Sequence, residues 1–532
     1  MRLNYSIGCV LLCLFAMSSL QAQRTVNIPA NPGTFVDIFP IIMGDTTAAG
    51  DRVDENTIYT LDNGGVYITT GRLVNKPNWP LQIQATDLSD TDLKPFLTRI
   101  PNATGSYPDI MRAEGDVSLT NLWIVSGEKG PGENHDWGKI RILGDSTTFR
   151  ATDCIIEKDR GGFIQLRANN VKCFVDNCIL RNGGNRFILQ GNGRGVDSRN
   201  FVFDTLIVTN SIIHNIVDRV FRSQGGTAPH GYIAFDNNTI FNVAGRHGCI
   251  QLRWVESARI TNNIFINPMM LGTTPAFTDE QNQPDNATHK IITLDTLTSS
   301  TELFIAGNNI FWTQDVIDVW AMHDSVSRPA ILSDLVKDAL GADTTNAYFE
   351  EVISLNNVPI NITQYIEDLY ADPTATDMFD FVVQDSAFAG GDRDFGNLFK
   401  FTAFDPCYDE NSASASAATH GGSIGYTLAC QGLTVPDEYG TGIEDLNQNL
   451  GLQAAPNPFR GHTEISFELS EAGAANLRVY DISGRVVSTL ANDYYAAGQH
   501  SLNWQANGLG SGIYFLKLET KAGFMTQKVM IQ

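Results

Sequence analysis

Short apolar segments in the middle of the chain carry arginine and glutamine at alternating positions. Residues 163–167, 220–224 and 249–253 read Phe-Ile-Gln-Leu-Arg, Val-Phe-Arg-Ser-Gln and Cys-Ile-Gln-Leu-Arg, and residues 187–190 align with them as a fourth segment. Side chains of a strand point alternately to its two faces. If the second residue of each segment points into a core, the polar residues point outward: Gln165, Arg167, Arg222, Gln224, Gln251 and Arg253.

More cationic residues stand just upstream of these segments: Arg160, Arg186, Arg219, Arg246 and His247. If the segments are stacked strands, about 4.8 Å separates one from the next. The sequence therefore predicts a continuous arginine and glutamine face along one side of the molecule.

Such a face suits an acidic polysaccharide. Guanidinium groups pair bidentately with carboxylate or sulfate, and glutamine can bond sugar hydroxyls. We expect substrate binding by Gln165, Arg167, Arg186, Arg219, Gln224, Arg246 and Gln251. The alternative is a solvated face on which the arginines pair with Asp159, Asp218 and Glu256.

Cleavage of a uronate polymer by β-elimination needs neutralisation of the sugar carboxylate and a base that removes the neighbouring proton. Arg222, Arg253 and His247 are the expected catalytic residues, although no motif singles them out. The other possible bases are His214, His230 and Lys158. Glycoside hydrolysis needs a pair of carboxylates. The segments above contain few acidic residues, so elimination is favoured over hydrolysis.

The charge distribution separates this region from the rest of the chain. The whole chain of 532 residues has a formal charge of -23, which opposes a nucleic-acid partner. Residues 139–259 contain 16 Lys and Arg against 10 Asp and Glu, a local net charge of +6. The remainder of the chain therefore carries about -29.

A repeated phrase indicates the elements that must position the arginines. A small polar residue, usually Asn, is followed by one residue and then Ile, with the phrase starting at Asp153, Asn177, Asn210, Asn238, Asn262 and Asn308. The steps are 24, 33, 28, 24 and 46 residues. A period of this size is typical of a solenoid. Strands of three to five residues in coils of 24 or more predict an all-β, right-handed parallel β-helix with three strands per coil.

The repeated Asn has a physical role at a tight bend between strands. It tolerates left-handed backbone geometry, and its side chain can bond buried backbone or the Asn of the next coil. Residues 24–115 are expected to form the cap and first coils, with a brief helical turn at 95–101. Two further helices are expected, at 333–340 and at 361–369.

The chain divides into four predicted parts. Residues 1–22 read as a signal peptide, with Arg2, an apolar run and a small-residue cleavage site that ends at Ala22. Residues 23–430 are the β-helix, whose closing coils are expected at 386–391 and 420–425, and 431–453 a linker. Alternating strands in 454–532 predict a small β-sandwich. We expect an exported, soluble protein without a transmembrane segment, and a monomer.

Six cysteines remain after the signal peptide. Cys407 and Cys430 flank one loop and are a plausible disulfide in an oxidising compartment. Cys154 and Cys178 occupy the same point of successive repeats, where they are either bridged or packed as small apolar side chains.

The C-terminal part resembles the sorting domain of the type IX secretion system. The matching stretches are Ala-Pro-Asn-Pro-Phe at 455–459, Val-Tyr-Asp-Ile-Ser-Gly-Arg at 479–485, Gly-Ile-Tyr at 512–514 and Lys-Val-Met-Ile at 528–531. The resemblance implies export by that machinery to the outer surface or medium of a Gram-negative bacterium, often with removal of the tail. A plain carbohydrate-binding sandwich is the alternative.

Residues 50–430 resemble the pectin-lyase-like β-helix superfamily, which includes lyases, hydrolases, epimerases and adhesins. The resemblance implies the fold and leaves the activity open. It also suggests calcium, for which Asp145, Asp218 and Asp236 are possible ligands. The polygalacturonase signatures are not present, and Pro229-His230-Gly231 is the nearest approach to one. We therefore expect a secreted or cell-surface protein that binds, and possibly cleaves by elimination, an acidic polysaccharide. The rival hypothesis is a non-catalytic surface or adhesin scaffold.

Overall fold

The structure is a computed structural model, and the residues that it describes are 23–90, 93–100, 109–125, 140–159, 161–184, 193–245, 247–273, 290–323, 326–358, 362–372, 404–419, 421–430 and, with short gaps, 433 and 452–531. The predicted signal peptide and most of the predicted linker lie outside these residues. The chain forms two compact units, residues 1–435 and 436–532. Each is described by itself.

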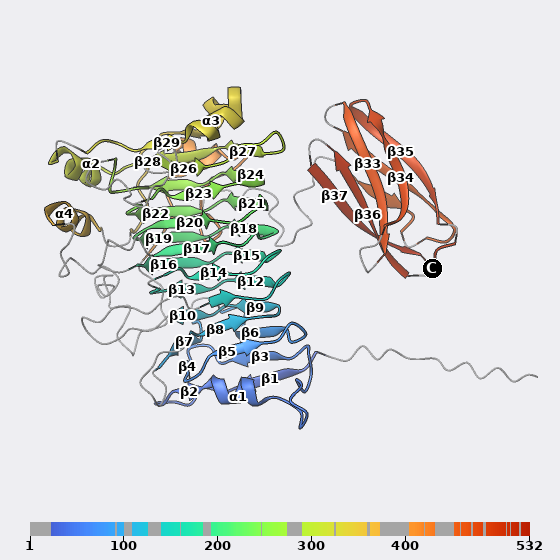
Figure 1. The fold of residues 1–532 in the computed structure, drawn as a ribbon, viewed down its shortest axis with the longest axis horizontal. Helices are drawn as coiled ribbons and strands as arrows, with labels where there is room; N and C mark the ends of the chain where they lie inside the picture. Colours follow the sequence, from blue (N-terminus) through green and yellow to red (C-terminus); the bar gives the residue numbers. More distant parts are fainter. Residues whose placement is uncertain are drawn as a thin grey trace, which may run out of the picture. The chain divides into compact units, whose positions relative to one another are not determined.

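The first unit is a stack of three parallel sheets (Figure 1). Sheet 1 contains β1 (Thr25–Ile28), β3 (Ile58–Leu61), β6 (Leu81–Ala85), β9 (Val117–Thr120), β12 (Thr148–Thr152), β15 (Lys172–Asp176), β18 (Thr205–Thr209), β21 (His230–Asp236), β24 (Val255–Thr261) and β27 (Glu302–Ala306). Sheet 2 contains β2 (Val36–Asp37), β4 (Val66–Thr69), β7 (Phe96–Arg99), β10 (Trp123–Val125), β13 (Ile155–Glu157), β16 (Ile179–Gly183), β19 (Ile212–Ile216), β22 (Thr239–Val243), β25 (Ile264–Ile266), β28 (Asn308–Phe311) and β30 (Tyr348–Phe349). Sheet 3 contains β5 (Leu73–Asn75), β8 (Met111–Ala113), β11 (Ile140–Ile142), β14 (Ile164–Leu166), β17 (Arg194–Arg199), β20 (Arg219–Gln224), β23 (Ile250–Arg253), β26 (Lys290–Leu294) and β29 (Ala330–Leu332).

From β3 to β28 the chain visits sheets 1, 2 and 3 in turn, and each strand pairs with the strand one coil further on. This is the predicted right-handed parallel β-helix with three strands per coil. The predicted helical turn at 95–101 is wrong, because β7 occupies that place as a sheet 2 strand. Leu97 is its inward residue and is only 1% exposed.

Inward side chains of all three sheets form one apolar core along the coil axis. A stack of coils leaves its core open at both ends, so each end needs a cover. Helix α1 (Ile38–Gly44) buries Ile38 and Ile42 at the first coils, and α3 (Asp334–Leu340) buries Val336 and Leu340 at the last (Figure 1). The α3 helix confirms the prediction at 333–340, and Ser333 caps it by accepting a bond from the Val336 amide.

The turn between sheets 1 and 2 explains the repeated phrase, but with one correction. It uses two successive positions, of which the first has left-handed backbone, with φ of 48–57° at Asn121, Asp153, Asn177, Asn210, Asn237 and Asn262 and 66° at Gly307. The second position points inward and is occupied by Cys154, Cys178, Ser211, Asn238, Asn263 and Asn308. The predicted phrase starts at Asn238 and Asn308 are therefore one position late, because two asparagines in succession cannot be told apart from the pattern alone.

The inward asparagines form a hydrogen-bonded ladder. The Asn238 amide donates to Asn263 Oδ1 at 3.0 Å, and the Asn263 amide donates to Asn308 Oδ1 at 2.9 Å. A second ladder follows sheet 2, where Asn267 donates to Asn242 at 3.1 Å and Asn242 to Asn215 at 3.2 Å. These bonds satisfy buried polar groups and fix the register of the coils.

Residues 404–419 and 421–430, here called the strap, cover the outer face of sheet 2. Phe404, Tyr408 and Ile424 of the strap pack with Phe241 and Phe311. The amides of Thr419, Gly425 and Tyr426 bond to Asn262 Oδ1, Asn262 O and Thr239 Oγ1. The closing coil predicted at 420–425 is wrong for its described residues, 421–425. They pack against the side of the β-helix and do not add a coil to its end. Residues 386–391 lie outside the described residues.

The strap contains the predicted disulfide between Cys407 and Cys430. Cys154 and Cys178 are not bridged, and both thiols are buried in the core. The Cys154 amide lies 3.4 Å from Cys178 Sγ, so the two are stacked neighbours, as their positions in the repeat predicted. Helix α2 (Gln314–Ala321) and helix α4 (Thr363–Ala371) complete this unit, and α4 confirms the helix expected at 361–369.

The second unit consists of two antiparallel sheets. One contains β31 (Gln453–Ala455), β32 (His462–Leu469) and β35 (Gly498–Gln505), and the other β34 (Val486–Tyr495), β33 (Gly473–Asp481), β36 (Gly512–Thr520) and β37 (Gly523–Ile531). Phe459, Phe467, Leu477, Trp504 and Leu516 belong to the core between them. This is the predicted β-sandwich.

Candidate functional site

The outer face of sheet 3 gathers the polar side chains that the sequence singled out. One outward residue per coil stands in register along it: Arg112, Arg141, Gln165, Asp197, Arg222, Gln251 and Thr293. Their neighbours along each strand, such as Ile164, Phe221 and Ile250, point into the core and are fully buried. The predicted alternation on this face is therefore present.

The strand predicted at 187–190 is not the one that joins this face. Strand β17 lies between β14 and β20, with Val196 in register with Ile164 and Phe221. The predicted segment lies outside the described residues. Its run of three apolar residues indicated a strand, whereas Val196 is the one large apolar residue among the six of β17, so the pattern favoured the wrong candidate.

This register brings Asp197 into the middle of the arginines. Arg222 Nε donates to Asp197 Oδ1 at 2.5 Å, and Arg167 Nη2 donates to Oδ2 at 2.6 Å. Burial alone would raise the pKa of Asp197, but Arg194, Arg222 and Arg167 outweigh it and lower the pKa to about 2. The carboxylate is thus ionised and holds two guanidinium groups in place.

Asp218 is the second centre of charge. Arg194 Nε contacts its Oδ2 at 2.7 Å, while Arg219 Nε and His247 Nδ1 contact its Oδ1 at 3.1 and 2.8 Å. Although burial opposes ionisation, the Arg219 and Arg194 guanidinium groups and the His247 bond hold the pKa of Asp218 well below its usual value. Arg219 also donates to Gln251, which links this centre to the outward column.

Positive charge is in excess within this network of described residues. Among the described residues, Arg167, Arg194, Arg219 and Arg222 form ion pairs with two carboxylates, Asp197 and Asp218. A third carboxylate, that of Asp295, lies near Arg219 and bonds to Gln251. Arg167 Nη1 is buried and has no hydrogen-bond partner. The Arg167 side chain as a whole is 22% exposed, so a bound anion can approach the network at this residue.

A similar cluster continues the face toward the first coils. Arg112, Arg72 and Arg141 surround Asp109, with distances of 2.6, 3.5 and 3.9 Å to its Oδ2. Again three guanidinium groups share one carboxylate. Sequence reasoning missed this cluster because its strands, β8 and β11, are only three residues long and carry a single outward arginine each.

The predicted residues fall into two groups. Those on the sheet 3 face are Gln165, Arg167, Arg219, Arg222, Gln224, His247, Gln251 and Arg253. Arg186 and Arg246 lie outside the described residues. Arg253 has a structural bond, since its guanidinium donates to the backbone carbonyl of Gly225.

The expectation of few acidic residues on this face is wrong, because Asp197, Asp218 and Asp109 all belong to it. The sequence did not predict Asp197 on this face, because residues 194–199 were not recognised as a strand. All three are bound to arginine, so none is placed as the protonated acid of a hydrolase.

Two candidate bases are buried elsewhere. Burial lowers the pKa of His230 and of His214 to about 3. His230 stacks on Phe203 with ring centroids 4.0 Å apart and bonds Ser223 Oγ. His214 is on the outer face of sheet 2, at 5.3 Å from the Phe404 ring of the strap. Both are therefore structural, as is Lys158, a 3% exposed residue with left-handed backbone.

The residues expected to bind calcium do not come together. Asp218 is paired with arginines, Asp145 accepts a bond from the Asn169 amide, and Asp236 accepts one from Asn262. In the described chain, the one group of three potential ligands close together is Asp405, Cys407 and Cys430, whose cysteines form the disulfide. Calcium stays a prediction.

None of the described helices is long and apolar enough to cross a membrane. In comparisons with known proteins, neither a curated protein nor a solved structure matches the chain. Residues 453–532 match the secretion system C-terminal sorting domain. The β-sandwich is thus the sorting domain through which the secretion machinery recognises the chain, and the protein is secreted or carried to the outer cell surface.

Proposed function

We propose that the sheet 3 face binds an acidic polysaccharide outside the cell. The observation that supports this best is the excess of guanidinium groups over carboxylates around Asp197 and Asp218. Arg167 is the most exposed of the four arginines in this network, with 22% of its side chain accessible, and would be the first to meet a ligand carboxylate or sulfate. Gln165 and Gln251 stand in the same column but are only 4% and 3% exposed, and Gln251 bonds Arg219, so their role is to support the arginines.

Because the coils repeat every 4.8 Å or so, the face offers polar side chains at regular steps along the axis. A linear polymer that lies along this axis can engage several coils at once. The cluster around Asp109 extends the face, so a longer chain would bind more tightly than a short one.

Cleavage by β-elimination is the finer proposal for the same face. Arg222 would neutralise the uronate carboxylate, and His247, oriented through its bond to Asp218, would remove the proton. Arg253 is a less suitable catalyst than expected because its guanidinium is bound to a backbone carbonyl.

Binding is tested with the exported full chain and immobilised pectate, alginate and glycosaminoglycans, with and without calcium, over a series of salt concentrations. We expect Arg167→Gln to weaken binding about tenfold and to reduce the salt dependence, because it removes one charge-assisted contact. Lys337→Gln is the matched control, since it removes one exposed positive charge on α3. Equal affinity of both variants and the wild type would contradict the proposal.

Elimination is tested in the same mixtures by the ultraviolet absorbance of unsaturated uronate. A signal that His247→Ala abolishes, while binding persists, would support catalysis. Binding without any absorbance signal would indicate a polysaccharide-binding protein without lyase activity. The absence of binding to every polymer would favour the non-catalytic surface scaffold.

A further inference from the structure

A second column of outward residues lies on sheet 1, on a different side of the coils from the arginine face. It consists of Arg150, Phe174, Ile207, Ala234, Arg259 and Phe304, one residue per coil and in register. We call it the sheet 1 stripe. Along each strand its members alternate with core residues such as Cys173 and Val175, so they point outward.

Each end of the stripe consists of an arginine stacked over a phenylalanine. The guanidinium carbon of Arg150 lies 4.1 Å from the ring centroid of Phe174, and that of Arg259 lies 4.7 Å from the ring centroid of Phe304. This stacking stabilises a guanidinium without consuming its N–H donors. Phe304 is 48% exposed, and Phe174 is partly exposed, so both rings present apolar surface.

The two arginines differ in their partners. Arg259 Nε donates to Thr261 Oγ1 at 3.2 Å and approaches Asp236 at 4.0 Å. Arg150 is exposed, and in the part of the chain that the structure describes its guanidinium has neither a hydrogen bond nor an ion pair. Arg150 is therefore a positioned cation with all its donors available.

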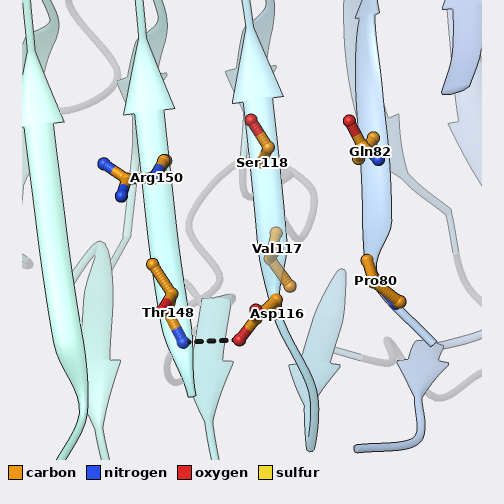
Figure 2. Close-up of a pocket in the computed structure, with 7 residues that line it drawn as sticks. All are labelled: Pro80, Gln82, Asp116, Val117, Ser118, Thr148 and Arg150. Carbon is orange, nitrogen blue, oxygen red and sulfur yellow. Dashed lines mark hydrogen bonds between the residues drawn. The ribbon is translucent and has the colours of Figure 1, made fainter. Parts of the chain in front are cut away.

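Arg150 also forms one wall of a shallow hollow on sheet 1 (Figure 2). Ser118 and Gln82 lie beside it in register on the next two strands, and their polar ends line the same surface. The hollow further contains Thr148, whose amide donates to Asp116 at 2.8 Å. Hydroxyl and amide groups next to a cation match the groups of an acidic sugar, and the Asp116 carboxylate, which also lines the hollow, is bound by the Thr148 amide.

The geometry favours an extended ligand. Arg150 and Arg259 are four strands apart, which is about 19 Å at the spacing of a β-sheet. Phe174 and Ile207, which are both partly exposed, form an apolar floor between them, and Ala234, 4% exposed, lies at its end. We propose that the sheet 1 stripe is a second binding face for a linear carboxylated polysaccharide, whose sugar rings lie on this floor and whose carboxylates pair with Arg150 and Arg259.

This inference does not depend on the sheet 3 site. If both faces bind, one molecule holds two polymer chains or two segments of one chain, and its avidity for a polymer network exceeds the affinity of either face. Such a protein would cross-link an acidic matrix.

Arginine footprinting distinguishes the two faces. The full chain is treated with phenylglyoxal, with and without oligogalacturonate, and modified peptides are quantified by mass spectrometry. We expect Arg150 to react readily in the free protein and to be protected at least fivefold by the ligand. Arg150 without protection would overturn the inference, whereas Arg167 reports separately on the sheet 3 site.

Variants provide the second test, in an Arg167→Gln background that weakens the other face. We expect Arg150→Gln and Phe174→Thr each to weaken oligogalacturonate binding about five- to tenfold further, and Lys337→Gln to change nothing. Arg150 is exposed, so its variant should keep the melting temperature of its parent. Unchanged affinity in both stripe variants would overturn the inference, as would equally tight binding of a neutral glucan.

Discussion

At the scale of single residues, the arginines of sheet 3 have two roles. Each buried carboxylate needs cations to remain ionised, and each arginine needs an anion to be held in place. The network around Asp197 and Asp218 meets both needs, and it contains more guanidinium groups than carboxylates paired with them. This excess is the feature on which the proposed ligand rests.

Asp197 should make stability depend on acid pH. Its pKa falls from 3.8 to about 2 on folding, so its contribution is complete above pH 4 or so and is lost as the pH falls through about 2. By linkage the contribution is about 2 kcal/mol. In urea unfolding, the stability difference between the wild type and Asp197→Asn should shrink by about this amount from pH 5 to pH 2. A constant difference would contradict the pairing.

The buried histidines should make the free energy of unfolding depend on pH in a higher range than Asp197 does. His214 and His230 remain neutral in the folded protein because burial lowers their pKa to about 3, whereas the unfolded chain takes up protons near 6.5. Stability from each group is therefore present above pH 6.5 and is lost as the pH falls toward 3. We expect His214→Phe to flatten the pH dependence of urea unfolding between pH 6.5 and 4. A slope equal to that of the wild type would show that His214 is protonated when folded.

At the scale of elements, buried asparagines and the strap hold the coils in place. Asn263 receives bonds from Asn238 and donates to Asn308 and to the Phe235 carbonyl. Its side chain is thus the middle step of a ladder with no water to replace it.

Asn263→Ala should cost about 2–4 kcal/mol of unfolding free energy, because it leaves polar groups of three coils without partners. Asn411→Ala is the control, since Asn411 is exposed and bonds only Asp409, within its own turn. Urea unfolding of both variants measures the difference. Similar losses in the two would show that the ladder contributes little.

The disulfide should hold the strap on sheet 2. Replacing both Cys407 and Cys430 by Ser removes the cross-link of a loop with a sequence separation of 23 residues. The expected loss is about 3 kcal/mol by loop entropy. Hydrogen exchange should become faster at the amides of Thr419, Gly425 and Tyr426, which bond to the helix. Unchanged exchange there would mean that apolar packing alone holds the strap.

At the scale of the whole molecule, the two compact units have separate tasks. The sorting domain has its own apolar core and is recognised for export, while the β-helix presents the polar faces. A chain that ends at Val435 should therefore keep the thermal unfolding transition of the β-helix and lose export. Calorimetry of the purified chain and immunoblots of the medium check the two parts. A lowered β-helix transition would show that the sorting domain stabilises it.

The sequence by itself determined the elements that depend on local pattern. The Asn-x-Ile phrase predicted a three-stranded coil, and alternation predicted that Gln165, Arg222 and Gln251 share a face. The sorting domain followed from motifs that span its whole length. These features can be predicted from the sequence because strand period, turn geometry and repeat length are each determined by residues within one coil.

Only the tertiary structure decided which residues meet between coils. The insertion between β16 and β17 concealed the strand that carries Asp197, and without that register the arginines had no visible partner. The strap reaches sheet 2 from more than a hundred residues away in sequence. A contact of this kind depends on the shape of the assembled coils. The sequence alone therefore could not predict which arginine pairs with which carboxylate, or where the excess of arginine lies.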